Sequence, residues 1–124
     1  MDANSLPSEI VPKLYGGRVE KAKAYMTENF HKDVTVEDIA ASAHLSKFHF
    51  GRIFKQITQL TPHQYLTGLR LKHAAQLLRN SKAQVKEIGY SSGYNNAEYF
   101  SSAFKKKYRV SPVEFRMKHR RTWS

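Results

Sequence analysis

Apolar residues recur every three or four positions along most of the chain, which is the spacing of a helix buried on one side. The first such run is Val19, Ala22 and Met26, and it predicts a helix over residues 18–29. Further helices are predicted over residues 36–43, 47–57, 62–79, 85–90 and 96–107, and a last one begins at residue 112. No stretch alternates as a half-buried strand would, so the sequence predicts an all-α fold.

Polar residues mark where several of these helices begin. Thr35 and Asp38 form the pattern of a capping box, and Ser46 stands at the N-cap of the next helix. A Thr-Pro step at residues 61–62 and a Ser-Pro step at residues 111–112 each place an N-cap before a proline at the first helical position. The helix over residues 62–79 is the longest, at about 27 Å.

The stretch over residues 46–65 occurs twice in the chain. The pairs that match fifty positions apart include Phe50 and Phe100, Phe54 and Phe104, Lys55 and Lys105, and Pro62 and Pro112. Upstream the offset is forty-nine, as in Ile39 and Ile88. Because a turn tolerates an insertion and a packed helix does not, the change of offset indicates a turn between two helices. One helix-turn-helix is therefore used twice.

These elements divide the chain into five segments. Residues 1–17 carry prolines and a Gly-Gly pair without periodicity, so they are expected to be a flexible tail or the remnant of a linker. Residues 18–61 are expected to form the first helix-turn-helix subdomain, residues 62–80 a connector helix, and residues 81–117 the second subdomain. Residues 118–124 are a basic tail that is expected to touch phosphate.

Charge is distributed very unevenly along the chain. The whole chain has a net charge of +11, but residues 1–45 have a net charge of −2 and residues 46–124 a net charge of +13. Such an asymmetry favours a polyanionic partner, nucleic acid before an anionic membrane surface. The alternative is a solvated basic face that only keeps the protein in solution.

Composition excludes several classes of site. The 124 residues include no cysteine, so disulfides, thiolate metal sites and cysteine nucleophiles are excluded. No apolar run approaches the roughly 18 residues of a membrane span, and no export signal is present, so the expected compartment is the cytoplasm. The six histidines show no clean pair of metal ligands, and no cofactor is expected.

The predicted helix over residues 47–57 has one apolar and one cationic side. Its apolar side consists of Phe50, Ile53, Phe54 and Ile57. The major groove of B-DNA is about 12 Å wide and admits one helix whose outer side chains meet base edges. On the outer side, Arg52 suits a guanine and Phe48 a thymine methyl group. Lys47 and Lys55 are placed for phosphate, as is the N-cap residue Ser46.

The predicted helix over residues 96–107 repeats this division with a different outer side. Glu98 can accept a hydrogen bond from cytosine, Ala97 can pack on a methyl group, and Ser101 and Ser102 can reach several bases. Its expected phosphate-binding residues are Asn96, Lys105 and Lys106.

Three of these assignments have a structural alternative. Phe48 can fold back onto a neighbouring helix, and Arg52 can contact phosphate in place of a base. Glu98 can be a solvated charge or can pair with Lys105 or Arg109.

Two long stretches carry a resemblance to a known family. They are FGRIFKQITQLTPHQYLTGLRLKHAAQLL, followed by EIGYSSGYNNAEYFSSAFKKKYRVSP. Together they resemble the C-terminal DNA-binding domain of the AraC/XylS family of bacterial transcription regulators, over about residues 18–117. The resemblance implies seven helices, with two helix-turn-helix units joined by a long helix. It also implies that one monomer reads two successive major-groove segments, and that RNA polymerase is a partner if the protein activates transcription.

The resemblance also implies which residues read bases. The matching positions are Phe48, Gly51, Arg52, Ala97, Glu98, Ser101 and Ser102. Three positions depart from the family pattern. Leu60 and Arg109 stand where glycine usually ends the recognition helices, and Gly89 stands where alanine is customary, at a cost of about 1 kcal/mol in helix propensity. Gly51 leaves one base-reading position without a side chain, so the first unit is expected to read fewer bases.

Other functions remain as alternatives at this stage. A Ser-x-x-Lys pattern at residues 102–105 is the one hint of an enzyme, and it is too short to be specific. RNA or non-specific architectural binding would show no preference among duplex sequences, and a protein-interaction module would use the helix over residues 62–79. The resemblance implies that many family members carry an N-terminal effector domain. The chain is therefore either a stand-alone regulator or a fragment.

Overall fold

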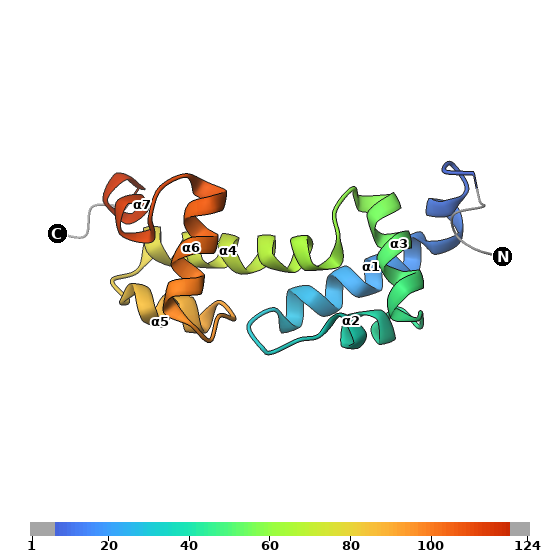
Figure 1. Cartoon of the computed structure of the whole chain (residues 1–124), viewed down its shortest axis with the longest axis horizontal. Coiled ribbons are helices and arrows are strands. Elements are labelled where there is room, and N and C mark those ends of the chain that lie inside the picture. The colour runs from blue at the N-terminus through green and yellow to red at the C-terminus, as the bar shows by residue number, and fades with distance from the viewer. Residues whose placement is uncertain (1–6, 120–124) are drawn as a thin grey trace. The chain divides into compact units, whose positions relative to one another are not determined.

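The computed structural model describes residues 7–119 and consists there of seven α-helices without a strand (Figure 1). Their bounds are α1 Val11–Asn29, α2 Val36–Ser42, α3 Lys47–Thr58, α4 Pro62–Asn80, α5 Val85–Ser91, α6 Ala97–Tyr108 and α7 Pro112–His119. The predicted all-α fold is confirmed. Of the expected basic tail, residues 118–119 instead belong to α7, and residues 120–124 lie outside the described residues.

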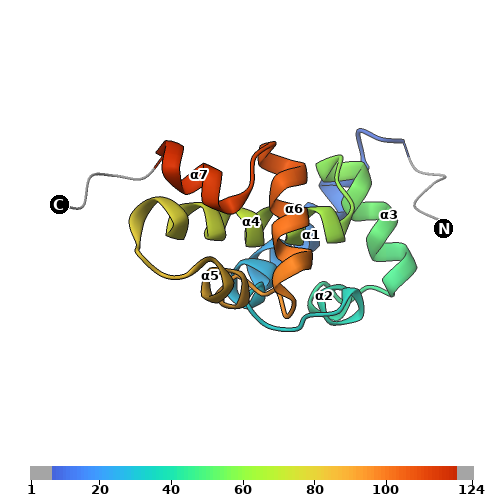
Figure 2. The same ribbon diagram turned by 60° about the vertical axis from the view of Figure 1, so that its left-hand side comes forward.

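The chain divides into two compact units whose boundary falls inside a helix. Unit 1 is Met1–Thr67 and unit 2 is Gly68–Ser124, so α4 contributes its first turns to unit 1 and the rest to unit 2. Each unit contains one helix-turn-helix, α2–α3 in unit 1 and α5–α6 in unit 2. Within unit 2, α5 and α7 lie at opposite ends of α6 in both views (Figures 1 and 2).

Unit 1 is built around the apolar side of α3. Phe50, Ile53 and Phe54 are fully buried, and the rings of Phe50 and Phe54 lie 5.4 Å apart. Helix α1 covers them with Val19, Ala22 and Met26, and α2 does so with Ile39 and Ala40, all of them buried. The first turns of α4 complete this core, where Tyr65 meets Phe54 edge to face at 5.5 Å.

Unit 2 repeats this core with α4 in the role of α1. The buried residues Leu71, Ala74 and Leu78 of α4 stand fifty-two positions after Val19, Ala22 and Met26 of α1. They pack with Ile88, Phe100, Phe104 and Phe115 in one cluster. Equivalent faces of α1 and α4 therefore pack against α3 and α6.

Arg116 fastens α7 to the end of α4. Its guanidinium donates hydrogen bonds to the carbonyl oxygens of Leu78 at 3.2 Å, Ser81 at 3.3 Å and Ala83 at 2.7 Å. The last carbonyls of a helix have no partner inside it, so Arg116 satisfies the α4 carbonyl of Leu78 together with two carbonyls that follow the helix. Unit 1 has Leu66 at the corresponding place, fifty positions earlier.

The first helix begins earlier than its periodicity indicated. Residues 11–17 were expected to belong to a tail or linker, but they are the first two turns of α1. Pro12 occupies an early helical position, where its missing N–H costs nothing, and Val11 is only 1% exposed. The two glycines at residues 16–17 misled the prediction, because packing against the rest of unit 1 outweighs their low helix propensity.

The predicted caps at Thr35, Ser46, Thr61 and Ser111 are confirmed, whereas the helix expected from residue 96 begins one residue later, at Ala97. Thr35 and Asp38 form a full capping box, and Ser46 and Asn96 accept hydrogen bonds from the N–H groups of His49 and Tyr99. Before the two prolines, Thr61 exchanges hydrogen bonds with Gln64, and Ser111 does the same with Glu114.

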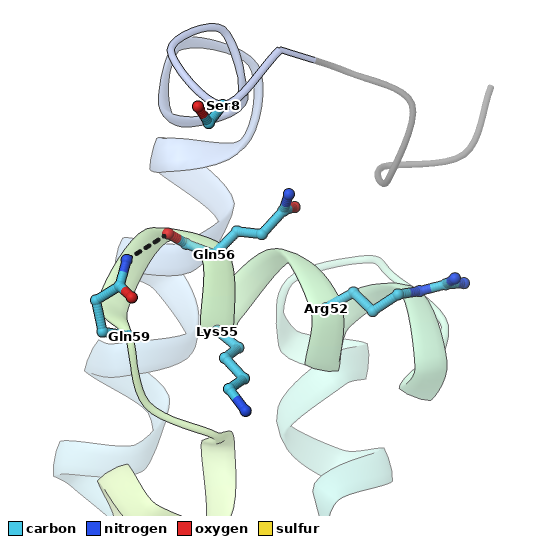
Figure 3. Close-up of a pocket in the computed structure, with 5 residues that line it drawn as sticks. All are labelled: Ser8, Arg52, Lys55, Gln56 and Gln59. Carbon is cyan, nitrogen blue, oxygen red and sulfur yellow. Dashed lines mark hydrogen bonds between the residues drawn. The ribbon is translucent and has the colours of Figure 1, made fainter.

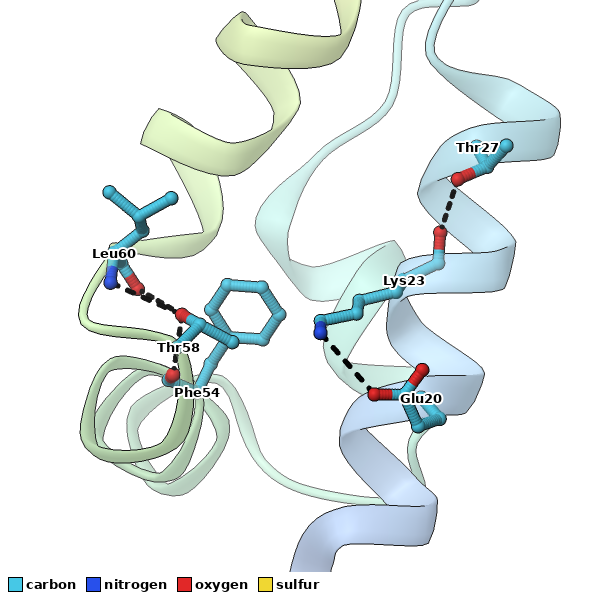
Figure 4. A network of polar contacts seen from close by, with 6 residues as sticks. All are labelled: Glu20, Lys23, Thr27, Phe54, Thr58 and Leu60. Atoms are coloured by element: carbon cyan, nitrogen blue, oxygen red, sulfur yellow. Dashed lines mark hydrogen bonds and ion pairs between the residues drawn. The ribbon is translucent and has the colours of Figure 1, made fainter.

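The helix ends differ in one respect from expectation. The left-handed residue that ends α3 is Gln59, with φ of 67°, and not Leu60. Its counterpart Arg109 ends α6 with φ of 69°, as expected from its position. After α3, Thr58 donates to the Phe54 carbonyl at 2.8 Å and accepts from the Leu60 N–H at 3.1 Å (Figure 4). This contact holds the non-glycine ending in place.

The turns inside the two helix-turn-helix motifs follow one plan. The N–H of Leu45 donates to the Ala40 carbonyl at 3.1 Å, and the N–H of Tyr94 donates to the Gly89 carbonyl at 3.0 Å. The turn of unit 2 has one more residue before its next helix, which confirms that the change of offset falls in a turn. The positive-φ residue is His44 in unit 1 and Gly93 in unit 2, with φ of 57° and 103°.

Gly89 has a reason that the sequence did not show. A Cβ atom added there would lie 2.8 Å from Cδ2 of Phe100. Helix α5 approaches α6 so closely that the departure from alanine is a packing requirement of this chain, and its cost in helix propensity is offset by the close contact.

Candidate nucleic-acid interface

The outer side of α3 carries the residues predicted to face DNA. With Phe50, Ile53 and Phe54 held in the core, helical geometry directs Phe48, Arg52 and Lys55 to the opposite side. All three are exposed, and Gly51 between them is half-buried. Phe48 is 77% exposed, so the alternative that it folds back onto a neighbouring helix is wrong.

Lys47 is held by an acidic residue of α2. Its Nζ lies 3.0 Å from Oε1 of Glu37, and this hydrogen-bonded cation is the main reason that the pKa of Glu37 lies below its ordinary value. Both side chains are at least half exposed, so the pair contributes little to stability and can exchange for another partner. A phosphate that binds Lys47 therefore competes with Glu37.

The outer side of α6 is more polar than that of α3. Glu98 and Ser102 are exposed, while Ala97 and Ser101 are half-buried. Among residues 7–119, Glu98 makes no ion pair with Lys105 or Arg109 within 4 Å, which removes one of its two structural alternatives. The predicted base-reading residues of α6 thus share one accessible side.

Cations gather at the end of α6. Lys105 and Lys106 are exposed in its last turn, beside Lys107. Cations in a last turn are favoured by the helix dipole, so this cluster also has a purely structural reason to exist. The N-cap residues Ser46 and Asn96 are exposed and use a side-chain oxygen for capping, which leaves the Ser46 O–H and the Asn96 amide N–H available as donors.

Sequence reasoning missed two parts of this surface. Tyr99 is 60% exposed beside Glu98, although its ring also meets Tyr94 at 5.9 Å. Ser8 lies in a turn before α1 and lines a pocket with Arg52 of α3. No local pattern indicates that residues 7–17 pack against α3, so the position of Ser8 could not be found from spacing.

Among residues 7–119, no group of three or more histidine, aspartate or glutamate side chains could hold a metal ion. Ser102 is exposed on the outer side of α6, and among residues 7–119 no basic side chain is hydrogen-bonded to it. No described helix is both long enough and apolar enough to cross a membrane.

Comparison with known proteins agrees with this geometry. A family model described as a helix-turn-helix domain matches residues 39–118. The fold is similar to an AraC-type transcriptional regulator from Chromobacterium violaceum, with a TM-score of 0.78 and 28% identity, over 84% of this chain and 93% of that one. The chain belongs to the AraC/XylS family.

Two other proteins match the chain over about four fifths of its length. The MmsAB operon regulatory protein of Pseudomonas aeruginosa is 40% identical over 97 residues, which are 78% of this chain and 32% of the relative. The DNA-binding domain of AdpA, solved in complex with a target DNA, is similar with a TM-score of 0.77 and 28% identity, over 81% of this chain and 90% of that one. The chain spans about a third of the length of the curated relatives that it matches.

Proposed function

We propose that this protein regulates transcription by binding a specific sequence of double-stranded DNA. In this proposal, α3 and α6 are recognition helices that read two successive major-groove segments, about 34 Å apart on the duplex. One chain carries both helices, so DNA binding needs no dimer. The expected compartment is the cytoplasm.

One observation carries the proposal: the chain contains two helix-turn-helix motifs with equivalent cores and different outer sides. Phe48 and Arg52 stand on one outer side, and Glu98 and Ser102 on the other. A non-specific binder needs only cations, whereas different polar and apolar side chains in equivalent places suit the reading of different bases. The site is therefore expected to be asymmetric. The similar domain of AdpA was solved in complex with a target DNA, which supports the binding of DNA.

Phosphate contacts supply affinity in this proposal. The proposed set is Ser46, Lys47, Lys55, Asn96, Lys105 and Lys106, of which four are lysines. If these four lysines neutralise phosphates, the logarithm of the binding constant falls with the logarithm of salt concentration at a slope of about −3 to −4.

In-vitro selection from random duplexes, followed by titration of the selected duplex at several salt concentrations, tests the proposal. The expected result is one asymmetric motif in two parts spaced by about ten base pairs, with the salt slope given above. Binding without an enriched sequence would favour the architectural or RNA-binding alternatives. A flat salt response would contradict the phosphate contacts.

A partner protein follows from the same proposal. A regulator that activates transcription has to act on RNA polymerase, so RNA polymerase is the expected partner if this chain is an activator. Two relatives, the lactose operon transcription activator of Staphylococcus xylosus and the activator RhaS, are activators by name. No enzymatic activity is part of the proposal.

A further inference from the structure

Unit 1 contains a pocket between the turn that precedes α1 and the C-terminal half of α3. Its volume is about 460 Å³, and its lining residues are Ser8, Arg52, Lys55, Gln56 and Gln59 (Figure 3). Four of the five lie on α3 or at its end, while Ser8 comes from a part of the chain nearly fifty residues away.

The turn that carries Ser8 is fixed against unit 1. The N–H of Ile10 donates to the Pro7 carbonyl at 3.1 Å, which closes the turn. Val11, the next residue, is 1% exposed, and the ring of Tyr15 meets His49 of α3 edge to face at 5.4 Å. Ser8 is thus held near α3 by a packed helix and not by a loose tail.

Each of the five lining residues carries a polar group that can donate a hydrogen bond. The lining contains two cations, two carboxamides and one hydroxyl, and no carboxylate. Glu9 follows Ser8 in the turn but is not part of the lining. The side-chain amide of Gln59 donates to the Gln56 carbonyl at 3.2 Å, which fixes it at the end of α3. A lining of this kind suits an anion with several oxygen atoms.

The position of the pocket along α3 indicates which kind of anion it can bind. Arg52 belongs to the outer side of the helix, and Gln56 and Gln59 follow it by one and two turns. From Phe48 to Gln56 the helix rises by about 12 Å, which is about the width of the major groove. If Phe48 meets a base, the pocket is therefore near the backbone at the edge of the groove.

We propose that this pocket binds a backbone phosphodiester of the DNA duplex, next to the bases read by α3, and that Ser8 is a DNA contact. The inference rests on the proposed function and extends it, because it adds the turn before α1 to the interface. A free phosphate ion offers the same oxygen chemistry, so the experiment has to separate the two sources.

Substitutions of opposite charge at Ser8 test the site. The Ser8→Lys variant should bind the selected duplex more tightly and steepen its salt slope by about 0.9, because one more phosphate is neutralised. The Ser8→Asp variant should weaken binding about tenfold at low salt, with a smaller loss at high salt. Gln76→Lys and Gln76→Asp are matched controls at an exposed position of α4 and should leave the slope unchanged.

A set of duplexes identifies the phosphate. Each duplex carries a single neutral methylphosphonate, and its position along the backbone differs from one duplex to the next. At one position, the substitution should weaken wild-type binding and partly restore binding by the Ser8→Asp variant. Ser8 variants that behave like the Gln76 variants, with sequence preference intact, would overturn this site and leave the proposed function standing. A wild-type protein without sequence preference would overturn the proposed function itself.

Amide NMR spectra separate the two sources of phosphate. The signals of Ser8 and Gln56 should shift on addition of the duplex at concentrations where inorganic phosphate leaves them unchanged. Shifts with inorganic phosphate and none with the duplex would overturn the assignment to DNA.

Discussion

The two helix-turn-helix units bury matching aromatic pairs, Phe50 with Phe54 and Phe100 with Phe104, yet they secure their first helices differently. Helix α2 begins with a complete capping box at Thr35 and Asp38. The N-cap residue of α5 is Gln84, whose side chain makes no capping hydrogen bond. The repeat therefore keeps the core and lets the polar details diverge.

The units differ in the same way at their edges. Unit 2 ends with Arg116 bound to three backbone carbonyls, whereas unit 1 has the apolar Leu66 in the corresponding place. Unit 1 instead carries the turn with Ser8 beside its recognition helix. Each unit thus combines an apolar core of the same design with a polar feature of its own.

The largest difference is expected from Arg116→Ala. Loss of charged hydrogen bonds to three carbonyls should lower the stability of unit 2 by about 3 kcal/mol and leave unit 1 nearly unchanged. Urea unfolding, followed by the amide signals of α3 and α6 separately, measures both. Lys118→Ala is the control, an exposed cation of the same helix. Equal losses in α3 and α6 would contradict the assignment of Arg116 to unit 2 alone.

A smaller difference is expected between the two outer sides. Arg52→Ala and Glu98→Ala should each relax the base preference in a different part of the selected site, at a cost of roughly 1–3 kcal/mol for the preferred base. Binding to single-base variants of the selected duplex measures this. Lys55→Ala is the control and should weaken all duplexes alike. If Arg52→Ala also weakens them all alike, Arg52 contacts phosphate.

The smallest expected difference between the two units is in how their helices α2 and α5 respond to acid. The backbone N–H of Thr35 holds the pKa of Asp38 below its ordinary 3.8, and Lys47 holds the pKa of Glu37 below 4.5. Because these carboxylates have lower pKa values when folded, their contribution is complete above about pH 5 and is lost as the pH falls through the folded pKa values.

Helix α2 should therefore loosen on acidification more than α5, which lacks this cap. Amide hydrogen exchange at the starts of the two helices, measured between pH 6 and pH 3 with correction for intrinsic rates, tests this. The Asp38→Asn variant should reduce the difference. A larger effect at α5 would show that the cap does not govern the acid response.

Much of this fold could be predicted from the periodicity of apolar residues, because the interactions that determine it are local. The core positions of α2, α3 and α6 follow from helical spacing, and the starts at Ser46 and Asn96 follow from a side chain bonding to a neighbouring N–H. Gly89 could not be understood without Phe100, because helix approach is a tertiary property. The same holds for the first turns of α1, whose glycines suggest a linker until Val11 is seen to be buried.

The candidate site shows the same division. Outer residues such as Arg52 and Glu98 could be predicted, since they are what remains when the core residues of a helix are assigned. The pairing of Lys47 with Glu37 and the position of Ser8 beside Gln56 could not, because each joins segments that no local pattern connects.

The double use of α4 has a consequence for dissecting this protein. Its first turns close the core of unit 1 with Leu66, and its later turns open the core of unit 2 with Leu71. Cutting the chain at the boundary between Thr67 and Gly68 would leave unit 1 with only the first six residues of α4 and unit 2 beginning in the middle of that helix. Fragments meant to isolate each half must both keep residues 62–80, so the two halves of this protein overlap in sequence.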